Sequence, residues 1–216
     1  MKLRGELIGT GKFGNIIGCQ GFDGEWIARK WRRHIYNPNT QPQRENRMKM
    51  SVFVKTLGDF SEFVKQVMPR SGVRSAWSDF IKRNIKTAIT GTYPNYQVDY
   101  TLLQITSGKV DLPYSPNATA DGTTLSLTWA DNSGMGNAHT DDKVCVIVYN
   151  PAKGQTLYNT ALAERNERNA TLSLPTAWTG DTVNVWMSMK RYAKTINGVS
   201  IAGGVSDSTF LASLPL

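Results

Sequence analysis

The residues best suited to chemistry in this 216-residue sequence form a basic and aromatic segment in its first quarter. Cationic side chains can neutralise phosphates or carboxylates, and aromatic rings between them can stack on nucleic-acid bases. Such a segment predicts a binding surface. Its members are Arg29, Lys30, Trp31, Arg32, Arg33, Arg44, Arg47 and Lys49.

This basic segment permits three interpretations. It binds nucleic acid through the phosphates, it docks an acidic protein partner, or its charges only solvate the faces around a small core that contains Trp26 and Trp31. Net charge governs association and solubility rather than fold. The sequence therefore leaves all three interpretations open.

The charge of the chain is concentrated in its N-terminal part. The whole sequence holds 25 Lys and Arg against 17 Asp and Glu, a formal net charge of +8. Residues 1–90 carry 17 basic and 7 acidic residues, whereas residues 91–216 carry 8 and 10. The two parts thus have net charges of +10 and −2, which places the expected contact surface in the first part.

A glycine-rich stretch at residues 9–14 matches the G-x-G-x-x-G pattern of phosphate-cradling loops. In that role the stretch must open a helix, because the helix N-terminus holds the phosphate. A strand-like Asn15-Ile16-Ile17 follows instead. We interpret these glycines as turn formers and as sites of close backbone packing.

Groups that could carry catalysis or bind a metal are scarce, with two His and two Cys in the chain. His139 has three aspartates nearby, but their spacing fits neither a calcium loop nor a zinc signature. No nucleophile pattern accompanies either histidine. We expect no enzymatic activity, no metal and no cofactor. The three aspartates are Asp131, Asp141 and Asp142.

The N-terminal part is expected to contain a β-hairpin followed by about three helices. An Asp23-Gly24 step between apolar runs is typical of a hairpin turn. Thr40 and Gln43 form a capping-box pattern at the start of a helix over residues 40–58. Apolar residues at helical spacing predict two more helices, over residues 59–68 and 75–89.

The C-terminal part is expected to be a β-sandwich. Apolar and polar residues alternate over residues 124–129, 144–148, 172–174 and 183–189, and turn-rich segments separate these runs. We expect turns at residues 113–122 and 197–204, and a solvated polar turn at 164–168. The fold class is therefore α+β, with a hairpin and helical region over 1–105 and an immunoglobulin or fibronectin III-like sandwich over 106–216.

No stretch of the sequence is apolar for 18 residues, so we expect no membrane insertion. The N-terminal segment lacks the apolar core of a secretory signal. We therefore expect intracellular synthesis without a signal peptide.

Several segments together resemble a Bacteroidota and phage-associated protein family of unknown function with a basic, Gly-rich N-terminal region. The likeness covers nearly the whole chain. The segments that carry it are residues 11–18, 28–30, 37–43, 90–96, 127–132, 136–138, 174–175, 178–181, 183–186 and 206–208.

The resemblance assigns no activity, but it implies small phage-type or cell-assembly proteins. It also implies a fibronectin III or immunoglobulin-like sandwich with Trp129 as a second-strand core residue. We expect a non-enzymatic structural or assembly protein, a virion component if phage-encoded, that binds a protein partner or self-assembles. The alternatives are nucleic-acid binding through residues 29–49 and surface or glycan adhesion by the sandwich through Trp178, Tyr149 or Tyr158.

Overall fold

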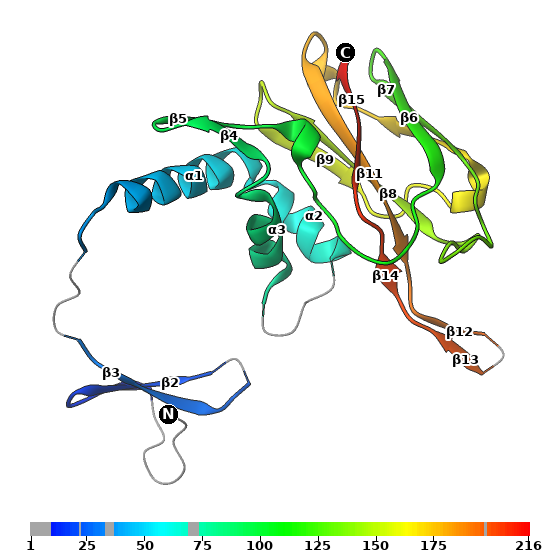
Figure 1. Ribbon diagram of the computed structural model, residues 1–216. Coiled ribbons are helices and arrows are strands. Elements are labelled where there is room, and N and C mark those ends of the chain that lie inside the picture. Colours follow the sequence, from blue (N-terminus) through cyan, green and yellow to red (C-terminus); the bar gives the residue numbers. More distant parts are fainter. Residues whose placement is uncertain (1–9, 22, 33–36, 69–73, 197) are drawn as a thin grey trace. The chain divides into compact units, whose positions relative to one another are not determined.

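The computed structural model describes residues 10–21, 23–32, 37–68, 74–196 and 198–216 (Figure 1). Helices and antiparallel strands in several sheets confirm the predicted α+β class. The chain divides into two compact units, residues 1–44 and residues 45–216. The division at residue 105 into two folding regions stays a prediction.

The first unit contains a three-stranded antiparallel sheet in the order β1-β2-β3. A tight turn joins β2 to β3, since the Gly21 amide donates to the Glu25 carbonyl at 2.7 Å and Asp23 Oδ1 accepts from the Glu25 amide. The predicted hairpin is confirmed, and its second strand ends at Lys30. The strands are β1 (Gly11–Phe13), β2 (Ile16–Gln20) and β3 (Trp26–Lys30).

The three α-helices of the described residues are α1 (Gln41–Leu57), α2 (Phe60–Val67) and α3 (Ala76–Asn84). One half of the predicted capping box forms, because Gln43 Oε1 accepts from the Thr40 amide at 3.2 Å. Helix α3 is shorter than predicted. Its last residue, Asn84, is buried and bonds through its side chain to both backbone polar groups of Gln104, and Ile89 already starts a strand.

The rest of the second unit is built from strands, with the 3₁₀ turns η1 (Tyr100–Leu102), η2 (Arg165–Glu167) and η3 (Thr176–Trp178) between them. The short strands are β4 (Ile89–Thr92), β5 (Asn95–Val98), β12 (Lys194–Ile196), β13 (Val199–Ile201) and β14 (Gly204–Val205). The longer strands are β6 (Tyr114–Asp121), β7 (Thr124–Ala130), β8 (Lys143–Asn150), β9 (Gln155–Asn159), β10 (Asn169–Ser173), β11 (Thr182–Arg191) and β15 (Thr209–Pro215).

Two antiparallel sheets dominate the second unit. One has the order β10-β7-β6, and the other has the order β14-β11-β8-β9 with β15 also paired to β11. Val146 on β8 and Met187 on β11 pack with Leu127 on β7 in one core between the two sheets. The side chains that alternate with them point to the opposite face of the larger sheet.

That opposite face is covered by the helices. Ile147 on β8 and Trp186 on β11 share a second core with Phe60 on α2 and Phe80 on α3. The Phe60 ring centroid lies 5.8 Å from that of Trp186 at an interplanar angle of 79°, an edge-to-face arrangement that aromatic pairs favour. The helices therefore belong to the same packed structure as the larger sheet.

Several sequence predictions about the C-terminal part are wrong. Residues 113–122, expected as a turn, contain strand β6, and residues 197–204, also expected as a turn, contain strand β13. The runs that became β9 and β15 carry a weaker alternation and were not expected as strands. Arg165, expected in a solvated turn, has 0% of its surface exposed.

Replacement of Phe60 with Ala tests the shared core. Phe60 is fully buried between helix and sheet, so we expect Phe60→Ala to lower the free energy of unfolding by about 3–5 kcal/mol. Val54 on α1 is 44% exposed, and Val54→Ala serves as control with an expected change within about 0.5 kcal/mol. Urea unfolding followed by circular dichroism measures both. Equal, small losses for the two variants would contradict a core shared by helices and sheet.

Candidate interaction surface

The predicted basic segment begins on β3, at an open edge of the N-terminal sheet. Arg29 and Lys30 are the last two residues of this strand and are exposed, as is Arg32. Arg33 lies outside the described residues. Within the described part of the chain, no acidic group lies within ion-pair distance of Arg29, Lys30 or Arg32.

The strand register divides these side chains between the two faces of the sheet. Lys12 on β1 pairs with Ile17 on β2, which pairs with Arg29 on β3, so these three share one face. Phe13, Ile16 and Lys30 are paired in the same way on the other face. We call the first the basic face and the second the apolar face. The segment is therefore not a single basic surface.

Lys12 is a member of the surface that the basic segment of the sequence did not indicate. Its Nζ lies 3.4 Å from the centroid of the Trp31 ring, a cation–π contact that also places Trp31 on the basic face. Pairing of β1 with β2 and of β2 with β3 brings residues 12 and 29 into one row across the sheet. The sequence signal for Lys12 was therefore the position of its strand next to the predicted hairpin. Two cations and one indole ring thus converge on this face.

The remaining predicted site residues lie on helix α1. Arg44 and Arg47 are exposed, and Arg44 is the last residue of the first compact unit. Lys49 belongs to the second unit, where its Nζ lies 5.0 Å over the Tyr96 ring of β5. The structure therefore brings Arg29, Lys12 and Trp31 together, whereas Arg47 and Lys49 lie in the second unit.

The N-terminal sheet has no apolar core of its own in its described residues. Across residues 10–21, 23–32 and 37–44, no apolar side chain is buried. Phe13 and Ile16, paired across β1 and β2, are 47% and 44% exposed. A small sheet normally needs a buried apolar face for independent stability. Its apolar side chains are therefore available to a partner.

The aspartates near His139 serve a structural purpose. Asp142 is fully buried and accepts hydrogen bonds from Arg191 Nε at 2.7 Å and from Arg165 at 3.0 Å. Burial opposes ionisation of this carboxyl, but the bonds from Arg191, the His139 amide and Arg165 outweigh it and hold its pKa below the ordinary value. Asp142 is thus a buried anion between two cations.

The two arginines of this buried charge cluster also bind the surrounding loops. Arg165 donates to Asn132 Oδ1 at 2.6 Å and to the Asp111 carbonyl at 2.6 Å. Arg191 donates to the side chain and the carbonyl of Asn137. The cluster therefore orders the loops before β6 and before β8. Its charged groups pair with one another inside the protein.

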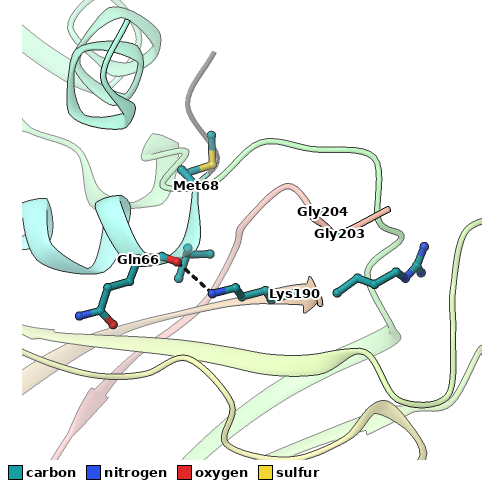
Figure 2. A pocket seen from close by; sticks show the side chains of 7 residues that line it. Gln66, Met68, Lys190, Gly203 and Gly204 are labelled. Carbon is teal, nitrogen blue, oxygen red and sulfur yellow. Dashed lines mark hydrogen bonds between the residues drawn. The ribbon is translucent and has the colours of Figure 1, made fainter. Parts of the chain in front are cut away.

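A small pocket lies where helix α2 ends beside β11 and β14 (Figure 2). Its volume is about 240 Å³, and Lys190 Nζ in its wall already donates to the Gln66 carbonyl at 2.9 Å. Pockets that bind organic ligands are usually larger, about 300–1,000 Å³. Its ionisable lining side chains are Lys190 and Arg191. Its residues are Gln66, Val67, Met68, Lys190, Arg191, Gly203 and Gly204.

A second pocket of about 350 Å³ lies at the loops that the buried charge cluster orders. Asp111 supplies its only carboxylate, and the pocket is rimmed by Tyr114 and Met135, which are 55% and 59% exposed. Leu112, Asn132 and Gly136 complete the lining.

Reactive groups are few in the described residues. Burial raises the pKa of the Cys145 thiol to about 12, which keeps it protonated and unreactive at neutral pH. Among the residues that the structure describes, no group of three or more His, Cys, Asp or Glu side chains is placed to hold a metal ion. None of the described helices is long and apolar enough to cross a bilayer.

Two of the three aromatic residues expected to support adhesion are buried. Trp178 is 2% exposed and Tyr149 is 3% exposed, and Trp178 Nε1 donates to Gln155 inside the structure. Tyr158 is half-buried against Phe63 of α2. The expectation that Trp178 and Tyr149 are exposed is therefore wrong.

The fold and its exposed groups define an α+β protein with exposed cations on a small N-terminal sheet whose described residues bury no apolar side chain. The chain belongs to the family of unknown function DUF6266, which matches residues 8–203. No curated protein matches the chain.

The buried charge cluster predicts a specific pH dependence of stability. The ordinary carboxyl pKa of 3.8 is lowered in folded Asp142, so its stabilising contribution is present above about pH 4 and is lost as pH falls through the folded pKa. We expect Asp142→Asn to cost about 3 kcal/mol at pH 7. The gap to the wild type should narrow below pH 4.

Urea unfolding at several pH values measures this difference, with Asp121→Asn as control because Asp121 is exposed at the end of β6. A gap between wild type and Asp142→Asn that is constant from pH 7 to about pH 2 would show that Asp142 is not a buried anion.

Proposed function

We propose that this chain is a non-enzymatic structural or assembly protein, a virion component if phage-encoded, that attaches to its partner through the N-terminal sheet. The observation that carries this proposal is that the described residues of the N-terminal sheet bury no apolar side chain. Phe13 and Ile16 are exposed on one face, while Lys12 and Arg29 lie on the other. A sheet with this composition gains its missing burial when it docks onto another molecule.

We further propose that the second unit is an immunoglobulin or fibronectin III-like sandwich, which the N-terminal sheet attaches to the partner. The strand order supports this, because β6, β7 and β10 form one sheet and β8, β9, β11 and β15 lie in the other. Trp129 on β7 is buried between the sheets and donates to the Arg165 carbonyl at 2.7 Å. Sandwiches of this type commonly serve adhesion and assembly, although fold alone assigns no function.

Cell fractionation in the organism that encodes the protein tests the attachment. The full chain is expected in rapidly sedimenting assemblies, and a chain that begins at Glu45 is expected in the soluble fraction. The double variant Phe13→Ser, Ile16→Ser should behave like the shortened chain, because it removes the exposed apolar pair.

The matched control is Met50→Ser, Val54→Ser, which removes two exposed apolar residues from helix α1 instead. It should sediment like the wild type. Two results would count against attachment through the N-terminal sheet. One is wild-type protein that stays in the soluble fraction, and the other is an equal loss of sedimenting protein in both double variants.

Nucleic-acid binding is the second candidate function. The basic face favours it, because Lys12, Arg29 and Trp31 lie together and no described acidic group pairs with Arg29. Cations and an aromatic ring side by side can neutralise a phosphate and stack on a base. Apolar docking and phosphate binding would use opposite faces of the same sheet.

Fluorescence anisotropy with a single-stranded oligonucleotide at several salt concentrations tests this candidate. Affinity should fall with salt, and Arg29→Ala should reduce the slope of log K against log salt by about 0.7 for the one lost phosphate contact. Lys55→Ala, at an exposed position of α1 in the other unit, should leave the slope unchanged. Absence of binding at low salt would eliminate this function.

A further inference from the structure

The pocket at Asp111 contains a carboxylate that no described cation neutralises. Asp111 is exposed, and its Oδ2 accepts one hydrogen bond, from the Asn137 amide at 2.6 Å. No Lys or Arg of the described residues lies within ion-pair distance of it. The pocket therefore offers a negative charge at a concave surface.

The walls of this pocket suit a cationic side chain. Tyr114 and Met135 rim it as exposed residues and lie close to each other, with the Tyr114 hydroxyl 3.7 Å from the Met135 sulfur. An aromatic ring attracts a cation over its face, and a methionine adapts its shape to a partner. A guanidinium or ammonium group would meet a carboxylate, an aromatic ring and an apolar rim.

The pocket is also held in a defined shape. A Cβ at Gly136 would lie 2.5 Å from Asp111 Oδ2, so glycine at this position leaves room for the carboxylate. Asn132 in the pocket wall is 4% exposed and fixed by Arg165, which also binds the Asp111 carbonyl. Arg165 of the buried charge cluster thus holds two residues of the pocket wall, Asn132 and Asp111, in place.

We propose that this pocket binds a basic side chain from segment Arg29–Arg32 of a second copy of this chain. This inference rests on the proposed assembly function and names the partner. The charges are complementary: Arg29, Lys30 and Arg32 are exposed without a described acidic partner, and Asp111 is exposed without a described basic one. Because the segment and the pocket are made of different residues, one copy can donate its segment to a neighbour in a head-to-tail contact, which can propagate into an open chain of copies.

A charge-exchange experiment tests the proposal on the purified full chain. Sedimentation velocity from about 10 µM to about 1 mM should show mass that rises with concentration and falls at high salt. Asp111→Arg should lower the association constant at least about tenfold, because like charges then meet. The triple variant Arg29→Asp, Lys30→Asp, Arg32→Asp should do the same.

An equimolar mixture of these two variants should associate again, because each contact then joins opposite charges. The Tyr114→Ser variant should associate more weakly than the wild type. Asp121→Arg reverses the charge of an exposed acid outside the pocket and should leave association unchanged. Circular dichroism confirms that each variant is folded.

A wild-type mass that is independent of concentration, or variants that stay apart when mixed, would overturn the head-to-tail contact. Neither result bears on the sedimentation of the full chain with cellular assemblies, which tests the proposed function separately.

Discussion

Burial of strands β8 and β11 on both faces is the constraint on which the second unit depends. Alternate residues of each strand enter different cores, as Val146 and Ile147 do on neighbouring positions of β8. The smaller sheet covers one face and the helices cover the other. Without the helices, Ile147 and Trp186 would be exposed to water at a cost of roughly 2–3 kcal/mol for each large apolar side chain.

The charge cluster at one end of these strands solves a different problem. A buried carboxylate is costly unless it is paired and hydrogen-bonded, and Asp142 meets this requirement with Arg165 and Arg191. The same arginines then bind backbone carbonyls of loops far away in sequence. In this way a core interaction fixes the position of Asp111, which lies at the surface.

The sequence predicted local structure well where one periodicity was strong. The hairpin turn at Asp23-Gly24 and the helices that begin near Thr40 and Asp59 were found from turn chemistry, capping and apolar spacing. Strand β6 was missed because Pro116 and small polar residues give it little alternation. Its pairing with β7 comes from tertiary context, which single-sequence propensity does not contain.

Only part of the site could be predicted from the sequence, because the rest depends on how the strands pair. A run of basic residues was visible, but the strand period of two places Arg29 and Lys30 on opposite faces and brings in Lys12 from another strand. Burial of Arg165 was also hidden, because its anionic partner Asp142 lies 23 residues away. Side-chain partners that meet only through the fold leave no local signal.

The two units therefore differ in how they are stabilised. Residues 45–216 hold two shared apolar cores, whereas the described residues of the N-terminal sheet bury no apolar side chain. Amide hydrogen exchange of the dilute full chain tests this contrast most directly. We expect β8, β11 and α2 to be protected together while β2 and β3 exchange rapidly. Protection of β2 and β3 equal to that of β8 would contradict this contrast between the units.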